Sequence, residues 1–310
     1  MTPRARQVAA ALLLDAVAGE PPAFLHPVVW MGKAISLVER IALTRTSRDI
    51  RLLSGIALAA ALPSLSFFVA AAVIRTIPRP LRPVLETILL SSTLSVRGLA
   101  RAAMAVEREL EWGDPETARA RVREFVGRDT ENLSEQEVVR AAVESVAENT
   151  SDGVIAPMLY GLAFGAPGAL AYKATNTLDS MIGYRDPPYA DFGMASALLD
   201  DLANLIPARI TAILAAAASS LPAAALTSAR RYGPLTSSPN AGWAEAAFAG
   251  ALGVRLGGTN SYGGVVHEGP VLGDGRPPVS QDIRRAVALM RRLCALLAGL
   301  MLLREAARRG

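Results

Sequence analysis

The run Leu52–Ile74 contains no charged residue, and it restricts more than any other feature what this chain can fold into. At ~1.5 Å rise per residue, a helix of this length crosses the ~30 Å hydrocarbon core of a bilayer. Pro63 predicts a kink within it. Arginines flank both ends, among them Arg51 and Arg75, so the positive-inside rule gives no orientation. We therefore expect a membrane-spanning helix here.

The composition extends this expectation to the whole chain. Hydrophobic residues make up 51% of the 310 residues and charged residues 19%, whereas soluble domains carry about 25% charged residues. Aromatic residues are only 5%. This low content favours closely packed helices over a membrane β-barrel, which carries girdles of aromatic residues. We predict an all-α, polytopic helical membrane protein with about five membrane-embedded helices, in one domain over residues 1–310. The further apolar ranges are 84–96, 154–174, 205–226 and 287–303. The glycines and prolines of 154–174 predict a broken or re-entrant segment, buried in protein or lining a cavity.

Other parts of the chain predict sizeable polar regions. Residues 97–150 have helical periodicity and indicate amphipathic helices outside the membrane, with Asp114 capping one helix and Ser134 opening another in a capping box. Residues 227–285 are rich in glycine and proline and predict a polar loop region. The N-terminal apolar run resembles a signal peptide, but Asp15 interrupts it, so we expect a retained helix.

The charged residues and the cysteine content exclude several classes of function. The net charge is +4, and only Lys33 and Lys173 among the 32 basic residues are lysines. The arginines suit anionic substrates, although the codon bias of a GC-rich genome explains them better. They are dispersed without interleaved aromatic residues, which argues against nucleic-acid binding. One cysteine, Cys294, excludes a disulfide framework, and His26 and His267 alone argue against a zinc centre.

Polar side chains concentrate between Arg128 and Arg209, beside segments apolar enough to enter a bilayer. Carboxylates there are costly and indicate a functional site. The patterns ENxxD, NxxD and DDxxN contain Glu148, Asn149, Asp152, Asn176, Asp179, Asp200, Asp201 and Asn204. Glu144 lies one helical turn before the first of them. Arg140, Glu144 and Glu148 share one helix face through their i, i+4 spacing. This face either belongs to the functional site or forms a ladder of ion pairs on the protein surface.

The DDxxN pattern predicts a magnesium site. Asp200 and Asp201 converge with Asn204 at i, i+4 and i, i+3 spacing, and such hard oxygen ligands suit Mg²⁺ holding phosphate. The alternative is a buried polar network between helices. Candidate clamps for phosphate or carboxylate are Arg128, Arg140, Arg185 and Arg209.

Glycine-rich stretches at residues 238–243 and 256–264 expose backbone N–H groups that can approach an anion. Neither is a P-loop or a dinucleotide fingerprint. His26, in a loop before a predicted helix at residues 30–43, is either a ligand-binding or proton-transfer group or a helix cap.

Two classes of function fit these residues. One is a membrane enzyme that uses Mg²⁺ on a phosphate-bearing substrate, and the other is a cation-coupled transporter. The large polar fraction favours the enzyme. Among enzymes, a Mg²⁺-dependent membrane prenyltransferase is an alternative, but its second aspartate-rich motif is poorly matched, because Asp179 and Asp186 are seven residues apart.

A closer resemblance covers most of the chain, from Gly19 to Gly264. The chain resembles the CobD/CbiB family of cobalamin biosynthesis, the adenosylcobinamide-phosphate synthases. The stretches that carry the resemblance are GEPPAFLHPVVWMGKAI, RDTENLSEQEVVRAAVESVAENTSDGVIAPMLY, YKATNTLDSMIGYR, FGMASALLDDLANLIPARI, SPNAGWAEAAFAGALGVRLGG and NSYGG. The resemblance weakens after about residue 270.

The resemblance implies an amide ligase in the cell (inner) membrane, with its active site on the cytoplasmic side. It would join adenosylcobyric acid to (R)-1-aminopropan-2-ol O-phosphate, with ATP and Mg²⁺ activating the carboxylate as an acyl phosphate. Its expected partners are the bilayer and either a second copy or other corrinoid-pathway membrane enzymes. The predicted catalytic residues are Glu144, Glu148 and Asp152, and the metal ligands are Asp179, Asp200, Asp201 and Asn204. The predicted substrate-binding residues are His26, Arg128, Asp129, Arg140, Asn149, Lys173, Asn176, Arg209, Asn240 and Asn260.

Overall fold

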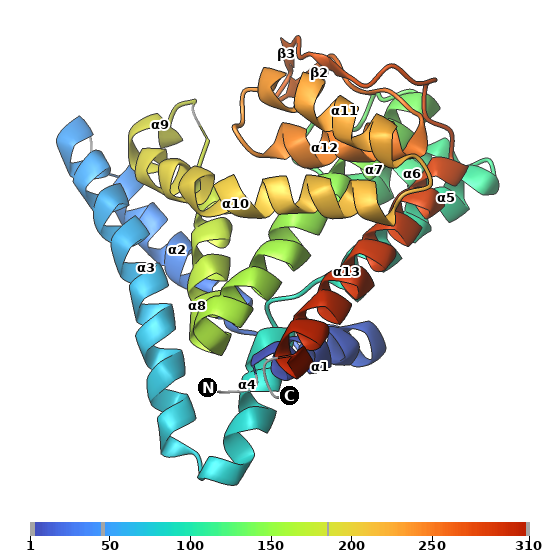
Figure 1. Ribbon diagram of the computed structural model, residues 1–310. Coiled ribbons are helices and arrows are strands. Elements are labelled where there is room, and N and C mark those ends of the chain that lie inside the picture. The colour runs from blue at the N-terminus through green and yellow to red at the C-terminus, as the bar shows by residue number, and fades with distance from the viewer. Residues whose placement is uncertain (1–3, 45–46, 185, 308–310) are drawn as a thin grey trace. The chain divides into compact units, whose positions relative to one another are not determined.

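The computed structural model describes residues 4–44, 47–184 and 186–307, and its regular structure is almost entirely helical (Figure 1). The helices are α1 (Arg4–Ala18), α2 (Pro27–Leu43), α3 (Arg48–Thr76), η1 (Arg79–Leu81), α4 (Arg82–Ser91), α5 (Val96–Glu111), α6 (Pro115–Arg123), α7 (Glu135–Thr150), η2 (Ser151–Ile155), α8 (Ala156–Ile182), α9 (Tyr189–Phe192), α10 (Met194–Ala218), α11 (Pro222–Tyr232), η3 (Gly233–Leu235), α12 (Ala241–Leu252) and α13 (Gln281–Ala307). The strands are β1 (Leu256–Gly257), β2 (Asn260–Tyr262), β3 (Val265–His267) and β4 (Val271–Leu272).

The predicted fold class, a polytopic helical membrane protein, is confirmed. Among the described residues, four helical segments are long and apolar enough to cross a membrane: Arg48–Thr76, Glu135–Ile182, Met194–Ala218 and Gln281–Ala307. The apolar range 84–96 is not among them, because α4 ends at Ser91 and α5 begins at Val96. A helix of ten residues is too short for a ~30 Å core.

The chain divides into two compact units that are interleaved along the sequence. Unit 1 consists of Met1–Ser95, Ala156–Asn204 and Arg304–Gly310, and unit 2 of Val96–Ile155 and Leu205–Leu303. Each unit therefore combines segments from distant parts of the chain, and each is described by itself below.

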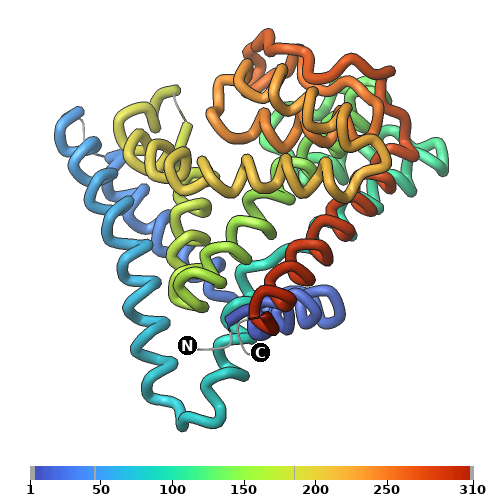
Figure 2. The backbone as a smooth tube through the Cα atoms, in the orientation of Figure 1, coloured from blue at the N-terminus to red at the C-terminus, as the bar shows by residue number. Residues whose placement is uncertain are grey.

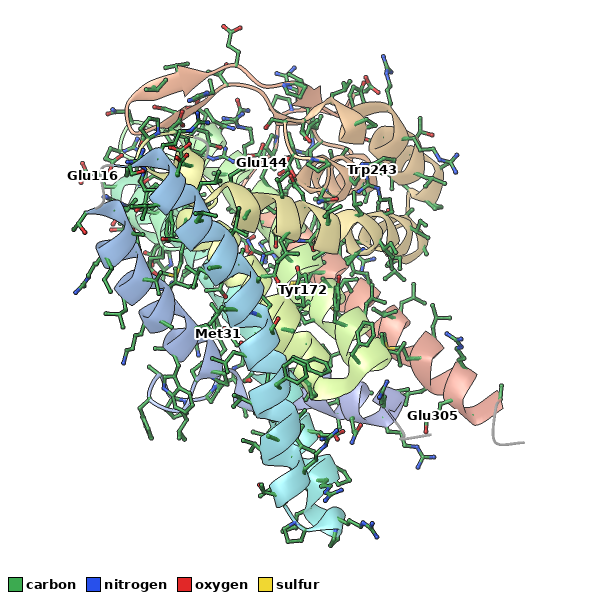
Figure 3. The ribbon with its side chains drawn as sticks, turned by 90° about the vertical axis from the view of Figure 1, so that its left-hand side faces the viewer. Met31, Glu116, Glu144, Tyr172, Trp243 and Glu305 are labelled. Carbon is green, nitrogen blue, oxygen red and sulfur yellow. The ribbon has the colours of Figure 1, made fainter. Side chains whose placement is uncertain are left out.

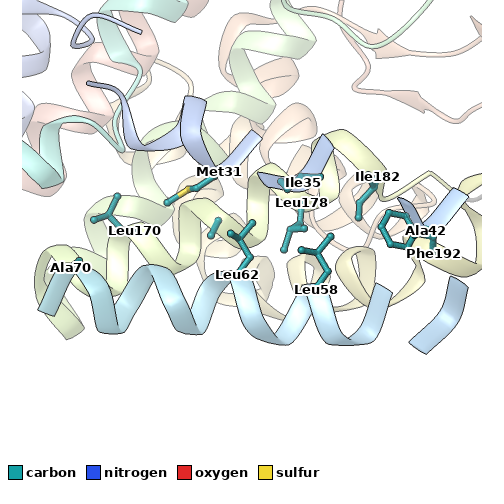
Figure 4. Packing of buried hydrophobic residues seen from close by; sticks show 11 residues of the cluster. Met31, Ile35, Ala42, Leu58, Leu62, Ala70, Leu170, Leu178, Ile182 and Phe192 are labelled. Carbon is teal, nitrogen blue, oxygen red and sulfur yellow. The ribbon is translucent and has the colours of Figure 1, made fainter. Parts of the chain in front are cut away.

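In unit 1, α3 packs against α8 and α9, and α2 packs against both α3 and α8. Buried aliphatic side chains fill the space between them (Figure 4). The largest are Ile35 from α2, Leu178 and Ile182 from α8, and Phe192 from α9, all fully buried. Burying one such side chain contributes about 1.5–3 kcal/mol, so this cluster fixes the part of α8 that carries the NxxD pattern.

The α8 segment is broken, as its glycines and prolines predict. At Gly165 the backbone adopts φ 76° and ψ −168°, and the chain changes direction there (Figure 2). Gly165, Ala166 and Gly168 are buried, and Arg4 donates a hydrogen bond to the carbonyl oxygen of Ala163. Irregular backbone in a membrane segment is tolerated only where protein or a cavity surrounds it, and here protein surrounds it.

Replacing Gly165 with alanine should destabilise the protein by about 1–3 kcal/mol, because this backbone region is essentially restricted to glycine. An added Cβ would meet no atom closer than 3.6 Å, so backbone strain is the expected cause. Thermal unfolding in detergent micelles measures the effect. Gly127→Ala is the matched control, since its backbone lies outside that region and no heavy atom lies within 4 Å of its added Cβ. Equal melting temperatures for the two variants would contradict the argument.

Local capping signals place several helix starts correctly. Ser134 and Glu137 form the predicted capping box at α7, and Asp114 accepts from Thr117 N at 3.0 Å at α6. His26 Nδ1 accepts from Val28 N at 3.2 Å and is the N-cap of α2. One of the two alternatives for His26, helix capping, is therefore confirmed.

Residues 227–285 of unit 2 contain more regular secondary structure than their glycine and proline content predicts. The range 227–285 includes the buried helix α12 and two antiparallel strand pairs, β1–β4 and β2–β3. The prediction that one apolar helix covers 205–226 is wrong: α10 begins at Met194 and ends at Ala218, and Pro222 starts α11. Proline cannot donate its backbone nitrogen and is favoured at the first helical position, so the run is split there.

Candidate functional site

The predicted site residues are divided between the two units, and those of each unit are named the unit 1 cluster and the unit 2 cluster. The unit 1 cluster contains His26, Lys173, Asn176, Asp179, Asp200, Asp201 and Asn204. The unit 2 cluster contains Arg128, Asp129, Arg140, Glu144, Glu148, Asn149, Asp152, Arg209, Asn240 and Asn260. Arg185, a predicted clamp, lies outside the described residues.

In the unit 1 cluster, α10 presents Asp200 and Asn204 on one face, as the i, i+4 spacing predicts. Asn204 Nδ2 donates to Asp200 Oδ2 at 2.9 Å, and Asn204 Oδ1 accepts from the Tyr172 hydroxyl of α8 at 2.8 Å. Asp200 Oδ1 is buried and accepts no well-aligned hydrogen bond from any described residue, although the side chain of Asn176 also acts on this carboxylate. The carboxylates of Asp179 and Asp201 act electrostatically on Asp200. A buried carboxylate oxygen without a donor, near two more carboxylates, favours a bound cation.

A positively charged side chain, Lys173 of α8, also lies in unit 1. Lys173 Nζ donates to Asn176 Oδ1 at 3.0 Å. Burial lowers the pKa of His26; Glu20 opposes this effect and Lys173 adds to it. The capping imidazole is therefore neutral near pH 7, and Lys173 carries the positive charge in this part of unit 1.

The unit 1 residues fit Mg²⁺ only together with other ligands. Among the described residues, no three histidine, cysteine, aspartate or glutamate side chains converge closely enough to hold a metal ion. Mg²⁺ is commonly held by one or two carboxylates plus substrate phosphates and water. The donor-free oxygen of Asp200 suits such an arrangement, in which phosphate supplies the ligands that the protein lacks.

In the unit 2 cluster, the centre is a buried ion pair between Arg128 and Glu144, the latter on α7 and labelled in Figure 3. Glu144 Oε2 accepts from Arg128, and Oε1 accepts from the backbone N–H of Gly257 at 2.6 Å. Arg128 Nη1 also donates to Asn260 Oδ1 at 2.7 Å. Both oxygens of Glu144 are therefore engaged, which makes Glu144 a positioning group for the loop after α12.

Arg140 holds the same loop and does not form a surface ladder with Glu144. Its Nη2 donates to Thr259 O at 2.8 Å and to Asn260 Oδ1 at 3.0 Å, and its Nη1 donates to Gly257 O. Gly257 has φ +71°, and an added Cβ would lie 2.2 Å from the carbonyl oxygen of Pro270. Only glycine fits this position.

The glycine-rich stretch at residues 256–264 donates backbone hydrogen bonds to anions, but these anions are carboxylates of the chain itself. Gly257 donates to Glu144, and Gly263 N and Gly264 N donate to Asp129 at 3.0 and 2.8 Å. The hydrogen bond from Gly264, with those from Ser261 and Gly263, holds the pKa of Asp129 below its ordinary value. Asp129 thereby fixes the β2–β3 hairpin.

Arg209 and Asn240, predicted separately as substrate-binding residues, are joined in unit 2. Arg209 Nη1 donates to Asn240 Oδ1 at 2.7 Å, and its guanidinium lies over the ring of Trp243, 4.8 Å from the centroid. Asn240 is the first residue before α12. This combination places a positive charge at a helix N-terminus, where anions are favoured.

The ENxxD pattern continues into an unusual turn. Asn149 donates to Ser145 O at 2.9 Å, and Asp152 lies in η2, a π-helical segment. Such segments are frequent at functional sites because they displace side chains from regular helical positions.

Glu245 is a further charged residue of unit 2 that is not among the predicted site residues. It lies on α12, where every other residue is apolar or glycine. Burial raises its pKa well above the ordinary value, as do the carboxylates of Glu144 and Glu148, against the opposing effect of Arg128 and Arg140. The sequence signal that could have identified Glu245 is its place as the single charged residue of an alanine-rich helix.

A groove of about 610 Å³ lies beside the β2–β3 hairpin of unit 2. Its lining includes Asp129, Glu131 and Glu137 together with Thr259 and Asn260. Three carboxylates repel phosphate, so we assign no nucleotide to this groove.

Known proteins similar to this chain agree on one family. The sequence profile of the family described as CobD/Cbib protein matches residues 8–290. The match therefore extends past residue 270, after which the motif resemblance weakens. "Cobalamin biosynthesis protein CobD" of Geobacter metallireducens is 45% identical over 298 residues, which cover 94% of this chain and 93% of that protein. "Cobalamin biosynthesis protein CbiB" of Salmonella typhi is 41% identical over 290 residues, with 90% and 91% covered. No solved structure matches. The chain therefore belongs to the CobD/CbiB family of cobalamin biosynthesis proteins.

Proposed function

We propose that this protein is an ATP-dependent amide ligase that joins adenosylcobyric acid to (R)-1-aminopropan-2-ol O-phosphate, giving adenosylcobinamide phosphate. Family membership supports the pathway, and the donor-free buried oxygen of Asp200 carries the chemical part of the proposal. That oxygen suits a cation that accompanies phosphate, as ATP-dependent activation of a carboxylate requires.

The unit 1 cluster would bind the nucleotide. Asp200 would hold Mg²⁺ with phosphate oxygens and water as the further ligands, while Asp179 and Asp201 add negative charge and Asn204 orients Asp200. The metal would offset the charge of the transferring phosphate oxygens. Lys173 would neutralise a further phosphate oxygen, and Asn176 keeps its ammonium in place through the 3.0 Å hydrogen bond. The substrate carboxylate attacks the terminal phosphorus, which yields an acyl phosphate and ADP.

The unit 2 cluster would bind the amine donor. Arg209 and Asn240 at the N-terminus of α12 suit its phosphate group, because the helix dipole adds to the arginine charge. Arg128, Arg140 and Glu144 hold the loop that carries Asn260. Glu148 and Asp152 are the remaining carboxylates of the ENxxD pattern and are proposed to face the amine.

The proposed site would be cytoplasmic, since ATP and corrinoid intermediates are produced there. The protein would act in contact with the bilayer, as a homo-oligomer or beside other corrinoid-pathway enzymes. These statements follow from the proposed reaction and from the membrane segments.

The reaction itself is the direct test. Purified protein incubated with adenosylcobyric acid, aminopropanol phosphate, ATP and Mg²⁺ should produce ADP and the amide in equal amounts, measured by mass spectrometry. Omission of adenosylcobyric acid, ATP or Mg²⁺ should stop both products, and omission of the amine should stop the amide and limit ADP to a single turnover. Sustained release of ADP without amide in the complete mixture would contradict the ligase. Movement of labelled substrate across proteoliposomes without ATP consumption would favour the transporter instead.

A further inference from the structure

Glu245 lies among the charged groups of the unit 2 cluster and is not used by the mechanism above. It projects from α12, which packs against α7. The charged and titratable groups that act on it are Glu144, Glu148 and Arg140 of α7, Arg128 before α7, and Tyr262 of β2. Among the described residues, no hydrogen bond or ion pair engages its carboxyl group, so its oxygen atoms are open to a ligand.

The two carboxylates that act on Glu245, those of Glu144 and Glu148, are less suited to accept a proton. Glu144 already accepts from Arg128 through one oxygen and from Gly257 N through the other. Glu148 is exposed to solvent, so water competes with a substrate for its oxygens. Glu245 is only partly exposed.

The charges of the cluster are unbalanced in a way that an ammonium group would correct. Three carboxylates, those of Glu144, Glu148 and Glu245, lie near the two guanidinium groups of Arg128 and Arg140. With Glu245 protonated these five groups have no net charge, and with Glu245 ionised they carry one uncompensated negative charge. A bound ammonium supplies the missing positive charge.

The raised pKa of Glu245 also suits a general base that takes a proton from an ammonium group. Burial and the neighbouring carboxylates raise its pKa well above the ordinary value of a glutamate. A general base works best when its pKa lies near the working pH, and enzymes raise glutamate pKa values for this purpose.

We infer that Glu245 is the catalytic base that binds and deprotonates the ammonium group of the amine donor. This inference rests on the proposed function. The ammonium proton passes to a carboxylate oxygen of Glu245, and the neutral amine attacks the acyl phosphate carbon. The C–N bond forms as the C–O bond to phosphate breaks, and the second amine proton leaves with the hydrogen phosphate product.

Hydroxylamine separates deprotonation from the rest of the reaction, because it is largely uncharged at neutral pH and needs no base. With aminopropanol phosphate, Glu245→Gln should lower the rate of amide formation by about 10²–10⁴-fold, the usual contribution of general base catalysis. With hydroxylamine, the same variant should form the hydroxamate of adenosylcobyric acid within a few-fold of the wild-type rate. Glu245→Asp should recover part of the amide rate, and the exposed Glu268→Gln is the matched control.

The outcomes distinguish the two levels of the proposal. If wild-type protein forms no ATP-dependent hydroxamate and no amide, the proposed function itself fails. If the wild type forms both but Glu245→Gln loses both equally, or loses neither, the assignment of Glu245 is overturned. The rising acidic limb of the wild-type pH–rate profile should also be absent from Glu245→Gln, which a purely structural role would not produce.

Discussion

Asp200→Asn should lower the rate of amide formation by about 10³-fold while the protein still inserts and folds. The change removes the charge of the carboxylate whose Oδ1 is buried without a donor, but an amide oxygen can still accept from Asn204. Metal-ion stabilisation of phosphate charge is worth several kcal/mol, and each ~1.4 kcal/mol corresponds to a factor of ten in rate. The measurement is ADP and amide formation over a range of Mg²⁺ concentrations.

Asp186→Asn is the matched control for this prediction. Asp186 belongs to the same unit but is exposed, so its loss should leave the rate and the Mg²⁺ dependence close to those of the wild type. A wild-type rate for Asp200→Asn, or an equal loss in both variants, would exclude Asp200 as a metal ligand.

Arg128→Ala should destabilise the protein by about 3–5 kcal/mol, the cost of leaving one partner of a buried ion pair uncompensated. The side chains of Arg128 and Glu144 are only 11% and 4% exposed, and Arg128 also holds Asn260. The loss should appear as a lower melting temperature in detergent and as faster proteolysis after α12.

A second ion pair in the same unit provides the contrast. The side chains of Arg121 and Glu124 are 44% and 61% exposed, and such surface pairs contribute about 0–1 kcal/mol. Arg121→Ala should therefore change the melting temperature little. The double variant Arg128→Ala/Glu144→Gln should be more stable than Arg128→Ala alone, because it no longer buries an unpaired charge. If Arg121→Ala and Arg128→Ala are equally stable, burial is not what makes the Arg128 pair important.

Sequence reasoning succeeded where the determining signal is local. The capping residues Asp114 and Ser134 specify helix starts through hydrogen bonds within three residues. The break at Gly165 follows from glycine and proline within one apolar segment. Asp200 and Asn204 meet because they are four residues apart on one helix.

It failed where the partner is distant. The Gly257 N–H lies 113 residues from its acceptor Glu144, so its glycine-rich stretch could be identified as anion-binding but not matched to its anion. Glu245 was missed for the same reason, since only the packing of α12 on α7 places it among other charges. Spacing alone did not predict that the patterned residues belong to two units.

The interleaving of the two units imposes an order on biogenesis. Residues 96–155 emerge from the ribosome before residues 156–204, which unit 1 requires for its core around Leu178. In unit 2, α7 packs against α5 and α6, which precede it, but its packing against α12 waits until residues 241–252 are made. The passages between units at 155/156, 204/205 and 303/304 fall within helical backbone, whereas the passage at 95/96 falls at the start of α5. A gene split after Ser95 is therefore the division at which two separately translated fragments have the best prospect of reassembling.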